Sequence, residues 1–179
     1  MNPSWNMVRK HLATLDKPAL VGLINDLYEL SSDNRDFIQG RFQPEENQGE
    51  VLKKYRKKIV EQFYPARGEA KLKLAEARKA IKDYRKATND VRGTAELMMT
   101  FVEQGAEFTY EYGDIDERFY SNVSSVLNEL ARLLLFEARE VYAQLSERLE
   151  RVEQSTRDVG WGFHDHIADV VWQLEDEFD

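Results

Sequence analysis

The feature that most constrains this chain is a hydrophobic side chain at every third or fourth position along nearly its whole length. That spacing gathers apolar groups on one face of an α-helix, whereas a half-buried strand would alternate at every second position. No stretch of the sequence shows such an alternation between turn signals. Only nine Gly and four Pro occur among 179 residues, so few positions interrupt a helix. We therefore predict an all-α fold of about eight or nine helices.

Helix ends can be placed from a few residues. Asp16 can cap a helix that carries Pro18 in its first turn, where no N–H is needed. Gly113 is expected to end another helix as a left-handed cap. The apolar stripes and the breaks between them predict helices over residues 5–15, 18–30, 33–42, 52–63, 74–84, 97–112, 119–134, 141–152 and 167–178. The short connections favour antiparallel neighbours, arranged as a bundle or a short HEAT-like α-solenoid in a single domain over residues 1–179.

The absence of Cys removes several classes of protein at once. Disulfide frameworks, Cys-based zinc sites, iron–sulfur clusters and thiol catalysis all need that side chain. The opening residues MNPSWNMVRKHL lack the continuous apolar core of a signal peptide. No run approaches the ~18 uncharged apolar residues that span a bilayer. We expect a cytoplasmic protein with no membrane contact.

Charge is distributed in two blocks of opposite sign. Residues 51–92, the basic block, contain 14 basic and five acidic residues. Residues 103–179, the acidic block, contain six Arg and 19 acidic residues. The formal net charge of −8 therefore hides a +9 segment and a −13 segment. Either the two blocks fold against each other and cancel, or they remain separate binding faces.

The basic block carries a candidate binding face for nucleic acid or for an acidic partner. The candidate contacts are Lys53, Lys54, Lys57, Lys58, Lys71, Arg78, Lys82 and Arg85. Lys and Arg can neutralise phosphates, and an interleaved Tyr55, Tyr64 or Tyr84 could stack on a base if it were exposed. The alternative is a solvated face, or one that pairs with the acidic block, with the tyrosines in the core. The acidic total charge weakens the nucleic-acid hypothesis.

A second group of candidate residues follows Gly113. Asp114 stands three residues before Glu117, which is the spacing of a capping box with Asp in the Ser/Thr role. Negative charge also suits the start of a helix. Asp116 lies between them, but the other ligand positions of a calcium loop are missing. We therefore interpret Asp114, Asp116 and Glu117 as a helix start that forms part of a motif surface.

The segment that contains Trp161, His164, Asp165 and His166 holds two of the three His residues. Imidazole and carboxylate are ligands that a metal-dependent hydrolase would use. On a helix, however, His164 and His166 diverge by about 200°, so distant carboxylates would have to complete a site. The simpler interpretation is a glycine-flanked turn into the last helix, with the aromatic residues packed. We count Trp161, His164 and Asp165 as further members of the motif surface.

The stretch Leu130–Phe136 and the apolar residues after it form the richest hydrophobic stripe. A stripe this long either fills the core of the fold or mediates association with a second copy. Both alternatives stay open from the sequence.

Four segments resemble, in their order along the chain, an uncharacterised bacterial family of small helical proteins that is described only as a domain of unknown function. They are the stretch ending in "DLYEL", "GEAKLKLAEARKAIKDYRKAT", "FVEQGAEFTYEYGDIDERFY" and "GWGFHD". "EYGDID" and "GWGFHD" are the most specific pieces. The resemblance covers nearly the whole chain and implies a helical, soluble protein. It implies no activity.

No phosphate loop, G-x-S-x-G elbow or H-E-x-x-H helix occurs, and Ser and His do not suggest a triad. The balance is therefore against an enzyme, and we expect no cofactor and no bound metal. The leading hypothesis is a non-enzymatic helical protein-interaction or scaffold module with charge-polarised faces. A nucleic-acid-associated protein is the alternative, and a metal-dependent hydrolase is a more distant one. We expect a protein partner, with a homodimer as a further alternative.

Overall fold

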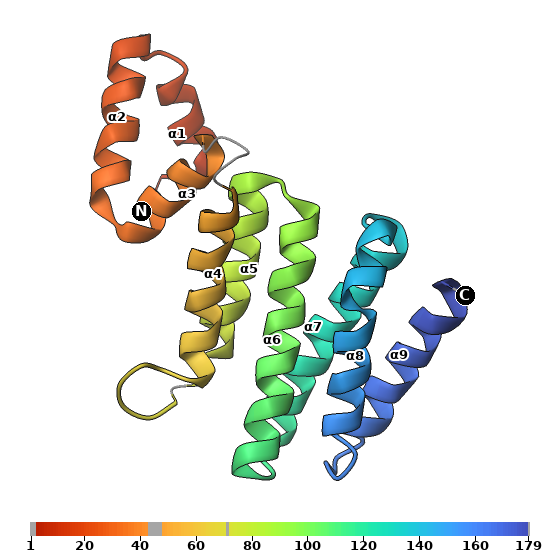
Figure 1. The fold of residues 1–179 in the computed structure, drawn as a ribbon. Coiled ribbons are helices and arrows are strands. Elements are labelled where there is room, and N and C mark those ends of the chain that lie inside the picture. The colour runs from red at the N-terminus through yellow and green to blue at the C-terminus, as the bar shows by residue number, and fades with distance from the viewer. Residues whose placement is uncertain (1–2, 43–47, 71, 179) are drawn as a thin grey trace. The chain divides into compact units, whose positions relative to one another are not determined.

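The computed structural model describes residues 3–42, 48–70 and 72–178 (Figure 1). Over these ranges the chain forms nine α-helices and one short 3-10 turn, Arg139–Val141, and no strand. The predicted all-α fold is confirmed. The chain divides into two compact units, residues 1–43 and 44–179, which we call the N-terminal unit and the C-terminal unit. The expectation of one domain over residues 1–179 stays a prediction.

The N-terminal unit consists of α1 (Trp5–Leu12), α2 (Lys17–Leu30) and α3 (Ser32–Phe42). The predicted cap of α2 is confirmed, since Asp16 Oδ1 accepts a hydrogen bond of 2.8 Å from the N–H of Ala19. Pro18 stands in the first turn. Its missing N–H leaves no backbone donor unsatisfied there.

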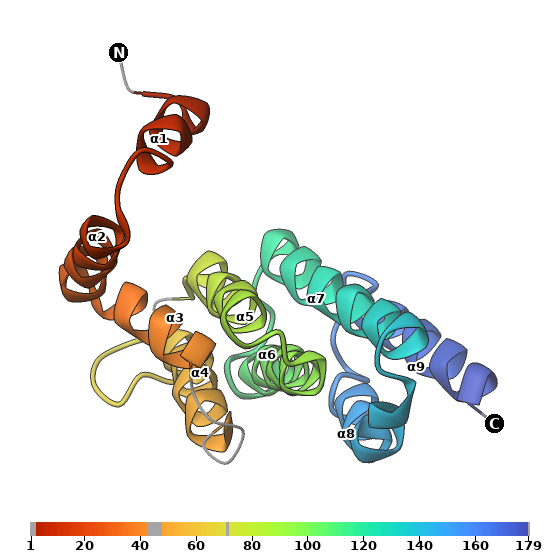
Figure 2. The same cartoon turned by 90° about the horizontal axis from the view of Figure 1, so that it is seen from above.

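The C-terminal unit contains three successive helix pairs. They are α4 (Gln48–Phe63) with α5 (Leu74–Thr88), α6 (Val91–Tyr112) with α7 (Glu117–Phe136), and α8 (Tyr142–Ser155) with α9 (Phe163–Phe178). Seen from above in Figure 2, α4, α6 and α8 form one layer and α5, α7 and α9 form the other. Side-by-side antiparallel pairs of this kind fit both packings predicted from the sequence. In the described part of the chain, no helix is long and apolar enough to cross a bilayer.

The hydrophobic core lies between these two layers. Phe63 of α4 packs edge-on against Phe101 of α6 and Phe119 of α7, with ring centroids 5.5 and 6.4 Å apart. Tyr55 and Tyr84 form a second edge-on pair at 5.5 Å. Each fully buried aromatic or aliphatic side chain of this kind stabilises a fold by about 1.5–3 kcal/mol. The same buried cluster contains Leu145 of α8 and Ile167 of α9, so the core joins all three helix pairs into one unit.

Gly105 lets α6 and α7 approach each other closely. A Cβ at this position would lie 2.7 Å from Cγ2 of Val123 on α7. That distance is shorter than a van der Waals contact, so only Gly fits without a shift of its neighbour. The close contact helps to fix the relative position of the two longest helices in the unit.

Several helix boundaries differ from the predictions by a few residues, and the largest difference is at the start of α6. α6 begins at Val91 and not near Leu97, because Asp90 caps it by accepting a hydrogen bond of 2.9 Å from the N–H of Gly93. Gly113 does end α6 with a positive φ of 81°. Its ψ of −160° lies far from the left-handed helical region, so the predicted left-handed cap is wrong in that respect. Gly can adopt such a conformation because it has no Cβ.

Candidate interaction surfaces

The lysines of the candidate basic face remain largely on the surface of α4 and α5. Lys53 pairs with Glu50 at 2.7 Å and Lys57 pairs with Glu61 at 3.7 Å, both within one helix. Lys54 and Lys82 are exposed, and the ammonium of Lys58 lies 5.2 Å from the centre of the Tyr55 ring. Lys71 lies outside the described residues. Exposed pairs of this kind contribute about 0–1 kcal/mol each, so they constrain the lysines little.

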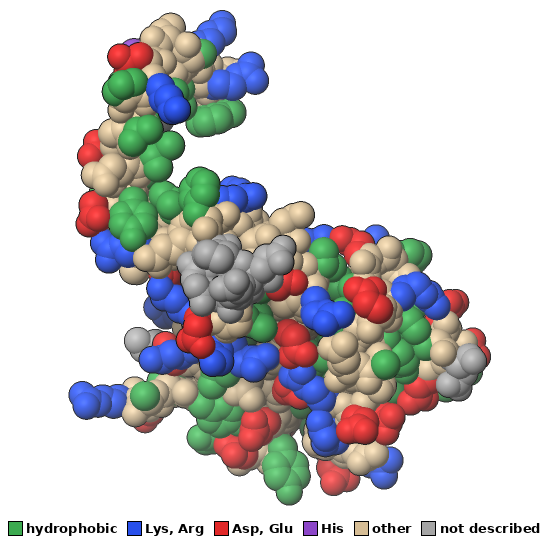
Figure 3. All heavy atoms as spheres, turned by 45° about the horizontal axis from the view of Figure 1, so that its top comes forward, with side chains coloured by type: hydrophobic (Ala, Val, Ile, Leu, Met, Phe, Trp, Pro, Cys, Tyr) green, Lys and Arg blue, Asp and Glu red, His purple; other side chains and the backbone are tan. Residues whose placement is uncertain are grey.

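The two arginines of that face are turned toward the acidic block. Arg78 on α5 pairs with Glu129 on α7 and also donates to the hydroxyl of Ser125 at 3.2 Å. Arg85 on α5 pairs with Glu137 at 2.5 Å. Figure 3 shows Lys and Arg side chains alternating with Asp and Glu across the visible face of the C-terminal unit. The basic and acidic blocks therefore neutralise each other in part within the fold.

Two of the three tyrosines of the basic block, Tyr55 and Tyr84, cannot stack on a base because they are buried. Tyr55 is 1% exposed and Tyr84 is 0% exposed, and they pack against each other in the core. The hydroxyl of Tyr84 donates a hydrogen bond of 2.5 Å to Oδ2 of Asp90. Burial is the main cause of the raised pKa of Tyr84, and the carboxylate of Asp90 adds to it. Nucleic-acid contact through the 53–86 face stays a prediction that depends on the lysines.

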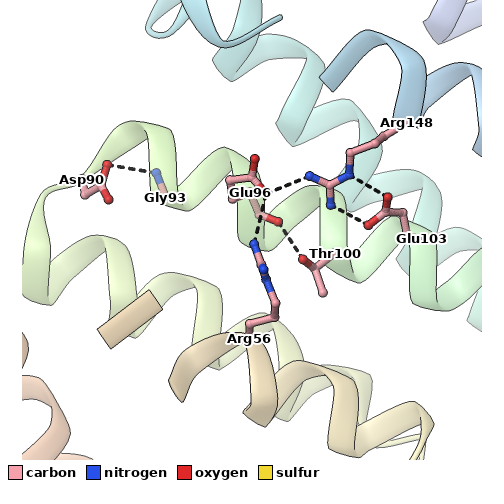
Figure 4. A network of polar contacts seen from close by, with 7 residues as sticks. All are labelled: Arg56, Asp90, Gly93, Glu96, Thr100, Glu103 and Arg148. Atoms are coloured by element: carbon pink, nitrogen blue, oxygen red, sulfur yellow. Dashed lines mark hydrogen bonds and ion pairs between the residues drawn. The ribbon is translucent and has the colours of Figure 1, made fainter. Parts of the chain in front are cut away.

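A network of charged side chains links α4, α6 and α8 (Figure 4). Arg148 on α8 lies between Glu96 and Glu103 on α6, and Glu96 also contacts Arg56 on α4 at 3.1 Å. The hydrogen bonds that Arg148 donates to Glu103 and then to Glu96 raise the pKa of Arg148, against the effect of burial. No local sequence pattern indicates this network, because its members come from three separate helices. It cross-links one layer of the C-terminal unit.

The two most specific motif segments meet in space. The indole N–H of Trp161 donates to Oδ2 of Asp114 at 2.5 Å, across 47 positions of the sequence. The hydroxyl of Tyr120 donates to Oδ1 of the same carboxylate at 2.6 Å. Both hydrogen bonds lower the pKa of Asp114, and the one from Tyr120 has the larger effect. "EYGDID" and "GWGFHD" are therefore joined by one carboxylate, which we call the motif junction.

The predicted capping role of Asp114 is wrong. Asp116 caps α7, because its backbone is extended and its Oδ1 accepts a hydrogen bond of 2.7 Å from the N–H of Phe119. Asp114 lies two residues before that cap position, and its side chain accepts hydrogen bonds from Trp161 and Tyr120. Glu117 is exposed in the first turn of α7, where its charge suits the helix start.

The contacts of His164 are with residues other than Asp114, the carboxylate of the motif junction. Nδ1 of His164 lies 3.4 Å from the hydroxyl of Thr156, and its Nε2 lies 3.7 Å from Glu153. Asp165 is exposed in the first turn of α9, and His166 is partly buried. In the described ranges, no three His, Asp or Glu side chains converge closely enough to hold a metal ion. Asp114 meets Trp161 and not the histidine pair.

The hydrophobic stripe that starts at Leu130 belongs to the core. Leu130, Leu133 and Leu134 are at most 3% exposed. Phe136 is the member that points outward, with 79% of its side chain surface exposed. The core interpretation is therefore confirmed for the stripe. A homodimer stays a prediction, and it would need another surface.

Sequence reasoning missed the apolar surface of the N-terminal unit. None of its described hydrophobic side chains is buried. Its exposed large hydrophobic residues are Trp5, Met7, Val21, Leu23, Ile24, Leu27, Leu30 and Phe42. Hydrophobic side chains also gather on the face of this unit that is visible in Figure 3. The helical spacing found these residues, but spacing alone does not distinguish a core stripe from an exposed one.

Comparison with known proteins places the chain in a family. The model of DUF6155, a family of unknown function, matches residues 4–175. The comparisons with the curated proteins and with the solved structures gave no match. The match includes both motif segments and both units. The chain therefore belongs to the DUF6155 family of unknown function.

Proposed function

We propose that this protein is a non-enzymatic interaction module whose N-terminal unit binds an amphipathic helix of a partner protein. The observation that carries the proposal is the apolar surface of that unit. Eight large hydrophobic residues are between 38% and 78% exposed there, while the described part of the unit buries only Asp36 and Gly40. Exposed hydrophobic side chains that line a common groove, as Ile24, Leu27 and Phe42 do, are typical of protein-binding sites.

A groove between α2 and α3 gives the proposed site its shape. The groove has a volume of about 320 Å³. Its apolar lining consists of Ile24, Leu27, Phe37, Ile38 and Phe42. Side chains three and four positions apart on two neighbouring helices present a hydrophobic channel. An amphipathic helix would place its apolar stripe in such a channel, as in other helix-in-groove complexes.

The charge of the groove favours a particular kind of helix. Arg41 is the charged residue among those that line it, and Asn34 is the other polar one. The N-terminal unit as a whole has five basic and five acidic residues, so no net field opposes a partner of either sign. A helix with an acidic residue beside its apolar stripe would gain a favourable charge contact with Arg41. We therefore expect such a helix as the partner.

The experiment measures the binding of a labelled amphipathic peptide of about 20 residues, with a Leu stripe flanked by Glu, to the full chain by fluorescence anisotropy. The test variant is Leu27→Glu, which places a charge in the groove. The matched control is Val21→Glu, an exposed position on the same helix outside the groove lining. We expect Leu27→Glu to weaken binding at least about tenfold and Val21→Glu to change it less than about twofold.

The remaining outcomes separate this partner from other occupants of the groove. A peptide with Lys in place of Glu should bind more weakly, because it opposes Arg41. Equal loss in both variants, or no binding to the unmodified chain, would overturn the proposal. Sedimentation of the free protein provides a further check: a concentration-dependent dimer that Leu27→Glu abolishes would identify a second copy as the occupant instead.

A further inference from the structure

A cavity of about 370 Å³ opens at the end of the C-terminal unit where α6 stops and the α8–α9 connection passes. Tyr110 and Asp114 line it from the end of α6 and the loop that follows. Gln154 lines it from α8, and Asp158 lines it from the connection. The cavity therefore lies beside the motif junction, where Asp114 holds the indole of Trp161.

Exposed aromatic side chains surround this end of the unit. Tyr110 is 76% exposed, and Tyr112 and Trp161 are each 64% exposed. Two of the three are held in place, because the ring of Tyr112 stacks on Phe108 at 4.5 Å and Trp161 is hydrogen-bonded to Asp114. Aromatic side chains that are fixed before binding lose little conformational freedom when a partner docks. We call Tyr110, Trp161, Asp114 and Asp158 the aromatic–acidic surface, because Tyr110, Asp114 and Asp158 line the cavity and Trp161 is bonded to Asp114.

The charge of this surface is negative. Residues 103–117 contain six acidic residues and no basic one. The cation that lines the cavity, Arg157, lies 3.7 Å from Glu153 and is thereby compensated. The carboxylate of Asp158 makes no hydrogen bond or ion pair with any part of the chain that the structure describes. An anionic ligand would be repelled here, whereas a cation would meet carboxylates and ring faces together.

We propose that the aromatic–acidic surface binds a lysine or arginine side chain of a basic partner segment. The carboxylates of Asp114 and Asp158 would attract its charge, and the ring of Tyr110 would contribute a cation–π contact. This site goes beyond the function proposed above, because it lies in the other unit and selects a charged group. Neither proposal depends on the other.

The probe is a fluorescent peptide of alternating Lys and Gly, with the corresponding Glu peptide and an uncharged Ser peptide as references. Asp158→Asn and Tyr110→Ala change exposed side chains with no described partner, so both variants should keep the fold. The matched control is Glu140→Gln, which removes the same charge from an exposed position in the 3-10 turn that precedes α8. Binding is measured by anisotropy on the full chain in a salt series.

We expect the Lys peptide to bind most tightly at low salt, and its affinity to fall as salt screens the charges. Asp158→Asn and Tyr110→Ala should each weaken it about five- to tenfold, and Glu140→Gln less than about twofold. Equal weakening by Asp158→Asn and Glu140→Gln would mean that only the general negative field acts, and it would overturn the proposal. Equal binding of the Ser peptide, or no binding of the Lys peptide, would do so as well.

Discussion

Arg148 on α8 holds Glu103 on α6 by two parallel hydrogen bonds. Its Nε donates to Oε1 at 2.7 Å and its Nη2 donates to Oε2 at 2.6 Å (Figure 4). The third nitrogen, Nη1, donates to Glu96 at 2.8 Å. A planar guanidinium can make this two-point contact with a carboxylate, whereas the ammonium of Lys cannot. One half-buried side chain therefore joins two helices of the same layer and reaches α4 through Glu96 and Arg56.

Replacing Arg148 by Met should destabilise the C-terminal unit by about 2–3 kcal/mol. The change removes three charge-assisted hydrogen bonds and leaves Glu96 and Glu103 partly buried without their shared cation. Met has a similar length, so the loss of packing is small. Urea unfolding followed by circular dichroism measures the difference. The matched control is Arg151→Met on the same helix, where the side chain is exposed and the expected change is below about 0.5 kcal/mol. Equal effects of the two substitutions would contradict a structural role for the network.

Gly105→Ala should destabilise the C-terminal unit by about 1–3 kcal/mol, because its Cβ would overlap Cγ2 of Val123. The second substitution Val123→Ala removes the obstructing methyl groups. The double variant should therefore cost less than the sum of the two single changes, by at least about 0.5 kcal/mol. The free energies of unfolding of the four proteins, measured by urea titration, give this coupling energy.

The control for the glycine prediction is Gly49→Ala in α4. No atom lies within 4 Å of a Cβ added there. Ala has the higher helix propensity, so this change should be neutral or stabilise the protein by up to about 1 kcal/mol. Strict additivity at positions 105 and 123 would show that the close approach of α6 and α7 does not limit the size of residue 105.

The helices were predictable because their signals are local. The spacing of apolar residues and the capping residue Asp16 depend on neighbours in the sequence. The wrong prediction of a capping role for Asp114 also has a physical reason. Three residues, Asp114, Asp116 and Glu117, offer carboxylates near the same helix start, and a capping pattern alone does not determine which backbone is extended. The distant Trp161 and the nearby Tyr120 engage Asp114, and the contact with Trp161 is invisible to local patterns.

The candidate surfaces were predictable only in part, because exposure depends on the tertiary fold. The sequence selected Asp114 and Trp161 as members of a motif surface, but not Tyr110 or Asp158. It grouped Arg78 with the surface lysines, whereas the fold turns that side chain toward Glu129 on α7. The sequence shows how much charge each block carries. Helix packing determines which of these charged side chains form ion pairs within the fold.

Hydrogen exchange should differ strongly between the two units. The described hydrophobic side chains of the N-terminal unit are all at least partly exposed, so little burial opposes the opening of α1 and α2. α6, by contrast, buries Leu97, Phe101 and Val102 completely. We expect backbone amides in α6 to exchange at least about a hundredfold more slowly than those in α1 and α2. Mass spectrometry of the labelled full chain resolves these segments.

Equal exchange rates of the backbone amides in α2 and α6 would contradict that expectation. They would mean that a partner or a second copy covers the apolar surface. Dilution of the sample distinguishes a second copy, because protection that depends on association decreases with protein concentration.

The link between Asp114 and Trp161 should break in acid. Hydrogen bonds from Tyr120 and Trp161 favour the ionised carboxylate, so the pKa of Asp114 is lower in the folded protein than in the unfolded chain. The contribution of Asp114 to stability is therefore present above the unfolded pKa of about 3.9 and is lost as pH falls through the lower folded value. The emission of Trp161, measured after Trp5→Phe and Trp172→Phe at two exposed positions, should change with a midpoint below 3.9. In the same background, Asp114→Asn should abolish that transition, because an amide does not titrate. A transition that persists in the Asn variant, or a midpoint at or above the ordinary Asp value, would show that another group controls the environment of Trp161.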